Sequence, residues 1–377
     1  MLYGELYGLN SLNKLMNSYD VKSNDYQKLW SKLSCSQIVW LMNRWLWLIF
    51  GPLFVKCVSQ SASTHSRQHL TLVVDGSIFR QWLGEGEVFG QYFAKYYSGQ
   101  YGKAVHGFNV ILCGMSLGDV FYPLHFQLRK KSQKDVDVAY EILKKVRCKL
   151  KALVEDVGLE LPTLYLSVDS GFRSTALLNW CKQVNIHYIG VPKNGHIFYV
   201  NTSSVEEKKV RNKFNIKQLK EVFKEKEAKQ GKKDSKNESF RWRIRAYYQC
   251  MGIEVTLLFF RLNGSKKVSV IFCNDLNIKA KTLRRRWFER TKIELLFRCI
   301  KHDLKIQQST VQNRLGFLKK LSFALVKALY AQLLTQKVKK ADKSLERIGY
   351  EKIKQLLGFH QIGREYLDKL IFDRPFS

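Results

Sequence analysis

The stretch from residue 69 to residue 192 alternates strand-like and helix-like patterns in one order, and this order limits the folds the chain can adopt. Short apolar or alternating runs predict strands, and apolar residues at a helical period predict helices. The predicted strands are 69–79, two strands within 103–128 turned around 116–119, 163–168 and 187–192, and the predicted helices are 135–157 and 174–184. The order β-β-β-α-β-α-β predicts a mixed α/β sheet that begins as an antiparallel meander and is covered by helices. The aromatic and glycine-rich residues 81–100 are expected to be irregular.

Two of the predicted strands end at an aspartate. The strand within 69–79 ends at Asp75, which Gly76 follows, and the strand 163–168 ends at Asp169. A single aspartate in such a place more often caps a turn than binds a ligand. A functional interpretation therefore depends on whether further acids join these two.

A third acid lies within the segment 287–301, which reads WFERTKIELLFRCIK. On one helix of about 100° per residue, a polar stripe about 60° wide holds Trp287, Arg290, Glu294 and Lys301, with Arg298 beside it, and the opposite side is apolar. Solvated helix faces usually mix charges into i,i+4 pairs. A helix face with one acid among several cations suits a site in which the carboxylate binds a metal ion and the cations bind phosphate. An ordinary ion pair of Glu294 is the alternative.

Asp75, Asp169 and Glu294 are the candidate catalytic and metal-binding residues. Three convergent carboxylates supply the oxygen ligands that Mg2+ or Mn2+ prefers, and they can hold two ions. Two ions about 3.5–4 Å apart stabilise both the attacking and the leaving oxygen of a phosphoryl transfer. The pattern therefore predicts phosphoryl transfer without a protein nucleophile.

The charge of the chain indicates a polyanionic partner. The 377 residues include 64 Lys and Arg against 32 Asp and Glu, a net charge of +32 that is spread through the sequence. Nucleic acid is the favoured partner, and general solubility or an acidic membrane surface are the alternatives. A hydrophobic content of 45% excludes a disordered chain. The eight cysteines form no C-x-x-C pair, so neither a zinc site nor a disulfide framework is predicted.

The most apolar segment, residues 38–58, has two interpretations: a membrane span or a buried helical region. Asn43 and Arg44 lie in its middle, and Gly51 with Pro52 should break it into pieces too short to span. We therefore expect buried helix and no membrane partner. Residues 59–68 are small and polar, as in a linker.

Together these motifs resemble the DDE transposases of bacterial insertion sequences over about residues 69–310. The most similar group has a ribonuclease-H-like core, a β-rich insertion and a Y-x2-R-x3-E-x6-K signature. Here the signature reads Trp287-x2-Arg290-x3-Glu294-x6-Lys301 with every spacing kept, and the two aspartates of the family fall on Asp75 and Asp169. Trp287 replaces the family tyrosine, and its indole can donate a hydrogen bond but not accept one.

The resemblance implies a transposase that cleaves DNA at the inverted-repeat ends of an insertion sequence and joins them to target DNA, using two Mg2+ (or Mn2+) ions. It implies double-stranded DNA as partner, a homodimer in the DNA complex, and a bacterial cytoplasmic location at the nucleoid. The DNA contacts would come from Trp287, Arg290, Arg298 and Lys301, and Trp242, Phe259 or Phe260 would stack on a flipped base unless they are core residues. A catalytically inactive or repurposed DNA-binding protein and a structure-selective nuclease of the same fold are the alternatives.

The resemblance and the composition shifts divide the chain into five regions. These are a helical DNA-binding region (1–66), the first part of the ribonuclease-H-like core (67–195), a basic β-rich insertion (196–278), the Glu helix of the core (279–310) and a helical C-terminal region (311–377). Within the insertion we expect a Lys/Glu-rich helix at 206–229 and strands at 240–248, 253–262 and 267–273. In the last region we expect amphipathic helices at 315–334 and 341–372.

Overall fold

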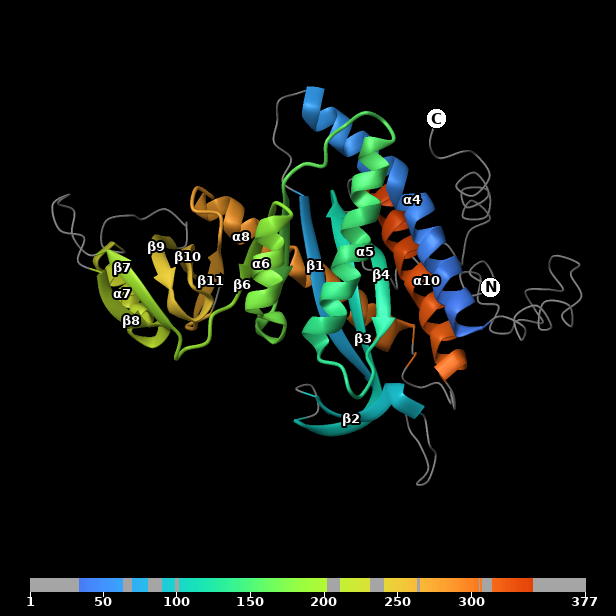
Figure 1. Cartoon of the computed structure of the whole chain (residues 1–377), viewed down its shortest axis with the longest axis horizontal. Helices are drawn as coiled ribbons and strands as arrows, with labels where there is room; N and C mark the ends of the chain where they lie inside the picture. The colour runs from blue at the N-terminus through green and yellow to red at the C-terminus, as the bar shows by residue number, and fades with distance from the viewer. Residues whose placement is uncertain are drawn as a thin grey trace, which may run out of the picture.

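One mixed sheet of eleven strands runs through the molecule in the order β2-β3-β1-β5-β6-β11-β10-β9-β7-β8, with β4 beside β3 (Figure 1). The computed structural model describes residues 34–63, 70–80, 90–98, 102–201, 211–230, 241–262, 265–304, 306 and 314–341. The strands are β1 Leu70–Arg80, β2 Phe93–Ser98, β3 Lys103–Leu117, β4 Val120–Leu128, β5 Leu164–Val168, β6 Ile186–Gly190, β7 Ile197–Asn201, β8 Arg211–Asn215, β9 Arg241–Tyr248, β10 Ile253–Arg261 and β11 Val268–Cys273. The helices are α4 Cys35–Ser63, α5 Asp135–Glu155, α6 Thr175–Gln183, α7 Ile216–Gln230, α8 Ala280–Phe288, α9 Arg290–Arg298 and α10 Arg314–Ala341, with a π-helical turn at Cys299–Asp303.

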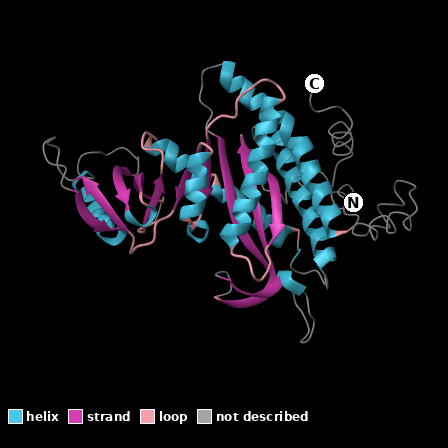
Figure 2. Cartoon of the chain, in the orientation of Figure 1, coloured by secondary structure: helices cyan, strands magenta, loops and turns pink. Residues whose placement is uncertain are grey.

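Five strands form the core half of the sheet. β3 pairs antiparallel with β1 and β4 antiparallel with β3, while β5 runs parallel to β1 and β6 parallel to β5. With α5 before β5 and α6 after it, this is the β-β-β-α-β-α-β order of the expected ribonuclease-H-like core. The predicted fold class is confirmed, and Figure 2 shows helices flanking this sheet.

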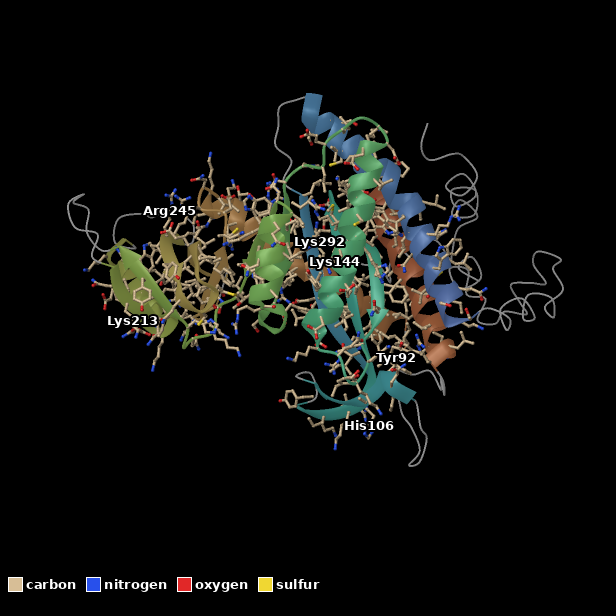
Figure 3. The ribbon with its side chains drawn as sticks, viewed as in Figure 1. Tyr92, His106, Lys144, Lys213, Arg245 and Lys292 are labelled. Atoms are coloured by element: carbon tan, nitrogen blue, oxygen red, sulfur yellow. The ribbon has the colours of Figure 1, made fainter. Side chains whose placement is uncertain are left out.

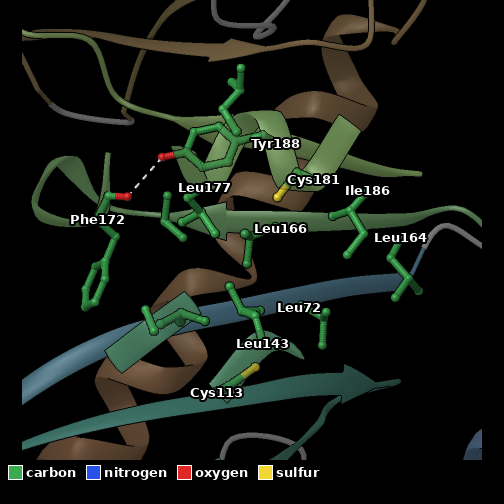
Figure 4. Packing of buried hydrophobic residues seen from close by; sticks show 14 of the residues in the cluster. Leu72, Cys113, Leu143, Leu164, Leu166, Phe172, Leu177, Cys181, Ile186 and Tyr188 are labelled. Carbon is green, nitrogen blue, oxygen red and sulfur yellow. Dashed lines mark hydrogen bonds between the residues drawn. The ribbon is translucent and has the colours of Figure 1, made fainter. Parts of the chain in front are cut away.

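The two faces of the core sheet carry different helices because successive side chains of a strand point to opposite faces. Leu72 and Val74 of β1 belong to the cluster that α5 and α6 cover, part of which is seen in Figure 4. Val73 points the other way and packs with Ile293 and Phe297 of α9. Asp75 is two residues after Val73 and therefore points to the same face of the sheet, so the strand directs this carboxylate toward α9.

The strands after β6 extend the sheet rather than forming a separate one. β11 joins β6 through two residue pairs, Phe272 with Gly190 and Cys273 with Ile189. The strands expected at 240–248, 253–262 and 267–273 are present as β9, β10 and β11. The expected helix at 206–229 is shorter, because β8 occupies 211–215 and α7 begins at Ile216.

Several local expectations are wrong. β1 does not end at Asp75 but continues to Arg80, because β3 pairs with it along its whole second half. Residues 81–100 are not wholly irregular, since β2 pairs with β3. The expected break at Gly51 and Pro52 is absent, and α4 is one helix. This helix also continues through residues 59–63 of the predicted linker 59–68. Of the expected C-terminal helices, the first is α10, and 342–372 lie outside the described residues, as do 1–33.

The continuity of α4 through Pro52 follows from which side of the helix the proline occupies. Pro52 is exposed, so the carbonyl of Leu48 that it leaves without a partner faces water. Phe50 and Phe54 flank it on the buried side and stack at 5.4 Å, and Phe50 also packs on Tyr122 of β4. Among the described helices, α4 is long and apolar enough to span a membrane by length and composition, a test that core helices of soluble proteins also pass.

Replacing Phe54 by Ala is expected to lower the free energy of unfolding by about 3–5 kcal/mol, because a fully buried ring leaves a cavity between α4 and the sheet. Urea denaturation measures this change. Leu48→Ala, on the exposed side of the same helix, is the control and should change stability by less than about 0.5 kcal/mol. Equal losses in the two variants would show that α4 does not pack as described.

Candidate active site

Asp75 and Asp169 lie side by side where β1 and β5 part. The parallel pairing of these strands ends with Val74 opposite Val168, and the next residue on each strand is an aspartate. Oδ1 of Asp75 accepts a hydrogen bond from the Gly76 N–H at 2.8 Å, and Oδ1 of Asp169 accepts one from the Gly171 N–H at 2.8 Å. Each carboxylate is thus oriented by its own backbone.

The third candidate acid reaches this pair through a shared cation. Arg290, at the start of α9, places one guanidinium nitrogen 2.6 Å from Oε1 of Glu294 and the other 3.6 Å from Oδ2 of Asp75. The centre of the Trp287 ring lies 5.0 Å from the guanidinium carbon, within the range of a cation–π contact. The structure therefore links Asp75, Glu294, Arg290 and Trp287 in one chain of contacts.

Burial and like charge make the Asp75 carboxylate costly to ionise. Its side chain is 13% exposed. Burial raises the pKa of Asp75 to about 7, with a further rise from the negative charges of Asp169 and Glu294, against the lowering by Arg290 and the Gly76 N–H. Burial also lowers the pKa of Lys301 to about 8, although the charge of Asp75 opposes this. Additional positive charge at this point would therefore stabilise the ionised carboxylate.

Within the described residues, no three His, Cys, Asp or Glu side chains are grouped closely enough to hold a metal ion. The donor chemistry nevertheless fits one, since the buried Asp75 carboxylate has the half-buried Asp169 carboxylate beside it and a guanidinium 3.6 Å away. Hard divalent ions prefer such oxygen ligands. Asp75 and Asp169 would hold the ion, and Glu294 would join them once it leaves Arg290.

The segment 287–301 is not the single helix that the sequence analysis expected. α8 ends at Phe288, α9 begins at Arg290, and residues 299–303 form a π-helical turn. The break follows from packing: α8 covers the cluster around Tyr165 and Phe260, whereas α9 covers the cluster around Val73, so one straight axis cannot serve both. Trp287 therefore belongs to a different helix from Glu294.

Of the other residues predicted to contact DNA, Lys301 lies near the acids and Trp242 lies on the opposite face of the sheet. The Lys301 ammonium sits 5.2 Å from the centre of the Phe79 ring, and the charge of Asp75 is close enough to raise the pKa of Lys301 against the effect of burial. Arg298 is exposed at the end of α9. Trp242 packs on Phe259 at 5.0 Å, on the face of the sheet away from α8 and α9. Phe259 and Phe260 are fully buried, so the core interpretation holds for both.

Sequence reasoning missed Arg286, a buried cation of α8. Its Nη1 donates to the Thr71 hydroxyl of β1 at 3.3 Å, and its guanidinium lies 5.9 Å from the Tyr165 ring of β5. Tyr165 in turn donates to Asp275 at 2.7 Å. These contacts attach the helix that precedes α9 to the two strands that carry the aspartates. Arg286 belongs to a run of three arginines, and such runs are usually solvated, so the sequence gives no indication that this side chain is buried.

The fold and the paired acids define a class: proteins with a ribonuclease-H-like core that carries two aspartates where the pairing of two adjacent parallel strands ends. The family model for the transposase DDE domain matches residues 65–326, more than half of the chain. The protein belongs to this family, whose members process DNA and typically use divalent metal ions.

Comparison with solved structures finds a likeness to the NurA nuclease from Sulfolobus solfataricus. It covers 58% of this chain and 72% of that one, with 9% identity and a TM-score of 0.23. A likeness at this TM-score does not extend to function. A comparison with curated proteins found no match.

Proposed function

We propose that this protein is the transposase of a bacterial insertion sequence, of the group with the Y-x2-R-x3-E-x6-K signature, and that it cleaves the inverted-repeat ends of its element and joins them to target DNA. The observation that carries this proposal is the position of Asp75 and Asp169 at the point where β1 and β5 part, with Glu294 linked to Asp75 through Arg290. Membership of the DDE family supports it.

The residues of the chain have distinct parts in the proposed reaction. Asp75, Asp169 and Glu294 would hold the metal. The Gly76 and Gly171 N–H groups orient the two aspartates, and Arg290 orients Glu294, before DNA arrives. Bound Mg2+ or Mn2+, as two ions, supplies activation of water or a DNA 3′-hydroxyl and stabilises the leaving oxygen. Arg290, which contacts both Asp75 and Glu294 and lies against the Trp287 ring, is placed to bind a phosphate oxygen of the DNA beside these acids.

The DNA path in this proposal follows the basic surface on both halves of the sheet. Cationic side chains occur on each half, among them Lys292 of α9, Lys213 of β8 and Arg245 of β9 (Figure 3). We assign Arg298 and Lys301 to phosphate and keep Trp242 as a DNA contact on the far face of the same sheet. A homodimer holding two element ends, a nucleoid location and the five-region division of the chain are parts of the same proposal.

A nicking experiment tests the proposal. Full-length protein with Mg2+ should cleave a plasmid that carries the DNA flanking its gene, at the ends of inverted repeats, and should leave a plasmid without these repeats intact. Cleavage of branched DNA irrespective of repeats would instead assign a structure-selective nuclease. DNA binding without any cleavage would assign a repurposed or inactive DNA-binding protein.

Replacing Arg290 or Lys301 by Gln is expected to weaken DNA binding and to reduce the slope of log K against log salt by about one, because each removes one phosphate contact. Fluorescence anisotropy across a salt series measures the slope. Lys144→Gln, on α5 across the sheet and paired with Glu141, is the matched control and should leave the slope unchanged. A slope that stays at the wild-type value in both site variants would count against these phosphate contacts.

A further inference from the structure

A cavity of about 780 Å3 lies between α4, β4, α5 and the start of α10. None of the three candidate catalytic acids lines it. Its apolar walls come from Val39 of α4, Val146 and Leu153 of α5, and Leu318 of α10. Cavities of roughly 300–1,000 Å3 with apolar walls and a few polar groups are typical of small-molecule sites.

Two buried polar groups line this cavity without a hydrogen-bond partner among the described residues. Asn43 is 5% exposed and its Oδ1 accepts no hydrogen bond, while Trp47 is 9% exposed and its indole N–H donates none. Both belong to α4 and stand one turn apart, so they lie on the same side of the helix. A buried unpaired donor or acceptor is costly, and native structures hold few of them. The pair calls for a ligand that carries both a donor and an acceptor.

The charge around the cavity calls for an anionic group on the same ligand. Its lining includes four basic side chains, Arg44, Lys145, Lys149 and Arg314, against one acid, Asp156. Aromatic rings accompany these cations: Lys149 lies 5.3 Å from the Trp47 ring and Arg314 lies 3.8 Å from the Tyr92 ring. Burial and the two lysines of α5 lower the pKa of His125 to about 4, so this lining residue is neutral at physiological pH.

We propose that the cavity between α4 and α5 binds a nucleotide. The base carries donors and acceptors on one edge for Asn43 and Trp47, its flat faces fit apolar and aromatic walls, and its phosphate meets the cations. A simple fatty anion would satisfy the cations and walls but would leave the acceptor Asn43 Oδ1 unpaired. The nucleotide comes either from the free pool or from an unpaired position in bound DNA, and the second source rests on the proposed transposase function.

The first arm of the test uses free deoxyadenosine monophosphate and isothermal titration of the full-length protein. Wild type is expected to bind it more tightly than inorganic phosphate. Asn43→Leu and Trp47→Phe should each weaken binding about tenfold by removing one hydrogen bond to the base. Lys145→Gln with Lys149→Gln should weaken it further at low salt, and Lys144→Gln, outside the cavity, should not. Equal affinity for phosphate and nucleotide, or unchanged affinity in both α4 variants, would overturn the proposal.

The second arm identifies the source. A duplex with one bulged 2-aminopurine should change its fluorescence on binding wild type, and this change should be lost in Asn43→Leu and Trp47→Phe, while a fully paired duplex shows no change. Binding of free nucleotide without this response assigns the free pool. Asp75→Asn should bind nucleotide as wild type does, so failure of the catalytic proposal and failure of this one are distinguishable. Absence of binding in both arms, with thermal unfolding showing folded protein, would refute the site.

Discussion

Asp75→Asn is expected to reduce Mg2+-dependent cleavage of element-end DNA by about a thousandfold or more. A metal held by carboxylates contributes several kcal/mol of transition-state stabilisation, and the amide is a poor substitute ligand of the same shape. Asp169→Asn and Glu294→Gln should lose activity on the same scale, because the proposed site needs all three acids. Single-turnover nicking with saturating protein measures the chemical step, and a gel-shift assay should show that DNA binding is retained.

A matched control separates metal binding from a general loss of negative charge. Asp137 is an exposed acid in the first turn of α5, and Asp137→Asn should cleave at the wild-type rate. Wild-type cleavage by any one of the three site variants would remove that residue from the proposed site. Loss of DNA binding along with cleavage would instead indicate that the fold had changed.

The second large effect concerns stability in the absence of divalent metal. Asp75 has a pKa of about 7 in the folded protein and 3.8 in the unfolded reference. Below about pH 4 both states hold the proton, so Asp75 has no effect on stability. As the pH rises from about 4 to about 7, the unfolded state releases the proton more readily, so the free energy of unfolding falls, by about 4 kcal/mol in total. Above about pH 7 the loss is complete and constant.

Asp75→Asn should abolish this fall and should be more stable than metal-free wild type at about pH 8. Adding Mg2+ at that pH should raise the unfolding midpoint of wild type, since the ion stabilises the ionised carboxylate, and should raise that of Asp75→Asn much less. Urea denaturation between pH 4 and 8 with a metal chelator checks both. Parallel pH profiles for the two proteins would show that Asp75 is not desolvated as described.

The sequence predicts the order of strands and helices in the core well, because each element carries its own apolar period. It places the end of β1 wrongly, because Asp75 leaves the pairing with β5 while β3 continues beside it. That distinction lies in the partner strands, which a local pattern does not contain. The same limit applies to the broken helix at Glu289, whose two parts pack on different clusters.

The candidate acids follow from the sequence, but their geometry does not. The spacing from Arg290 to Glu294 allows an i,i+4 ion pair, yet only the fold brings Asp75 to the same guanidinium. The sequence does indicate on which face of the sheet Trp242 lies. Arginines alternate with apolar residues in the RWRIR segment of β9, so Trp242 points to the face opposite the arginines. No sequence pattern predicts the cavity beside α4. In the sequence, Asn43 is only a polar residue within an apolar segment, which counts against a membrane span but does not indicate a binding site.

The two residue pairs between β6 and β11 have a consequence for how such a protein can change over evolution. The chain leaves the core at Gly190 and returns at Cys273, and these positions are neighbours on adjacent strands. The intervening chain therefore starts and finishes at neighbouring positions inside the sheet, where β11 pairs with β6. The strands farthest from the core, β7 and β8, can lengthen or shrink without altering the separation between the strands that bear the aspartates and α8, whereas β10 and β11 are constrained because α8 packs on them. The outer strands can therefore vary while the positions of Asp75 and Asp169 stay fixed.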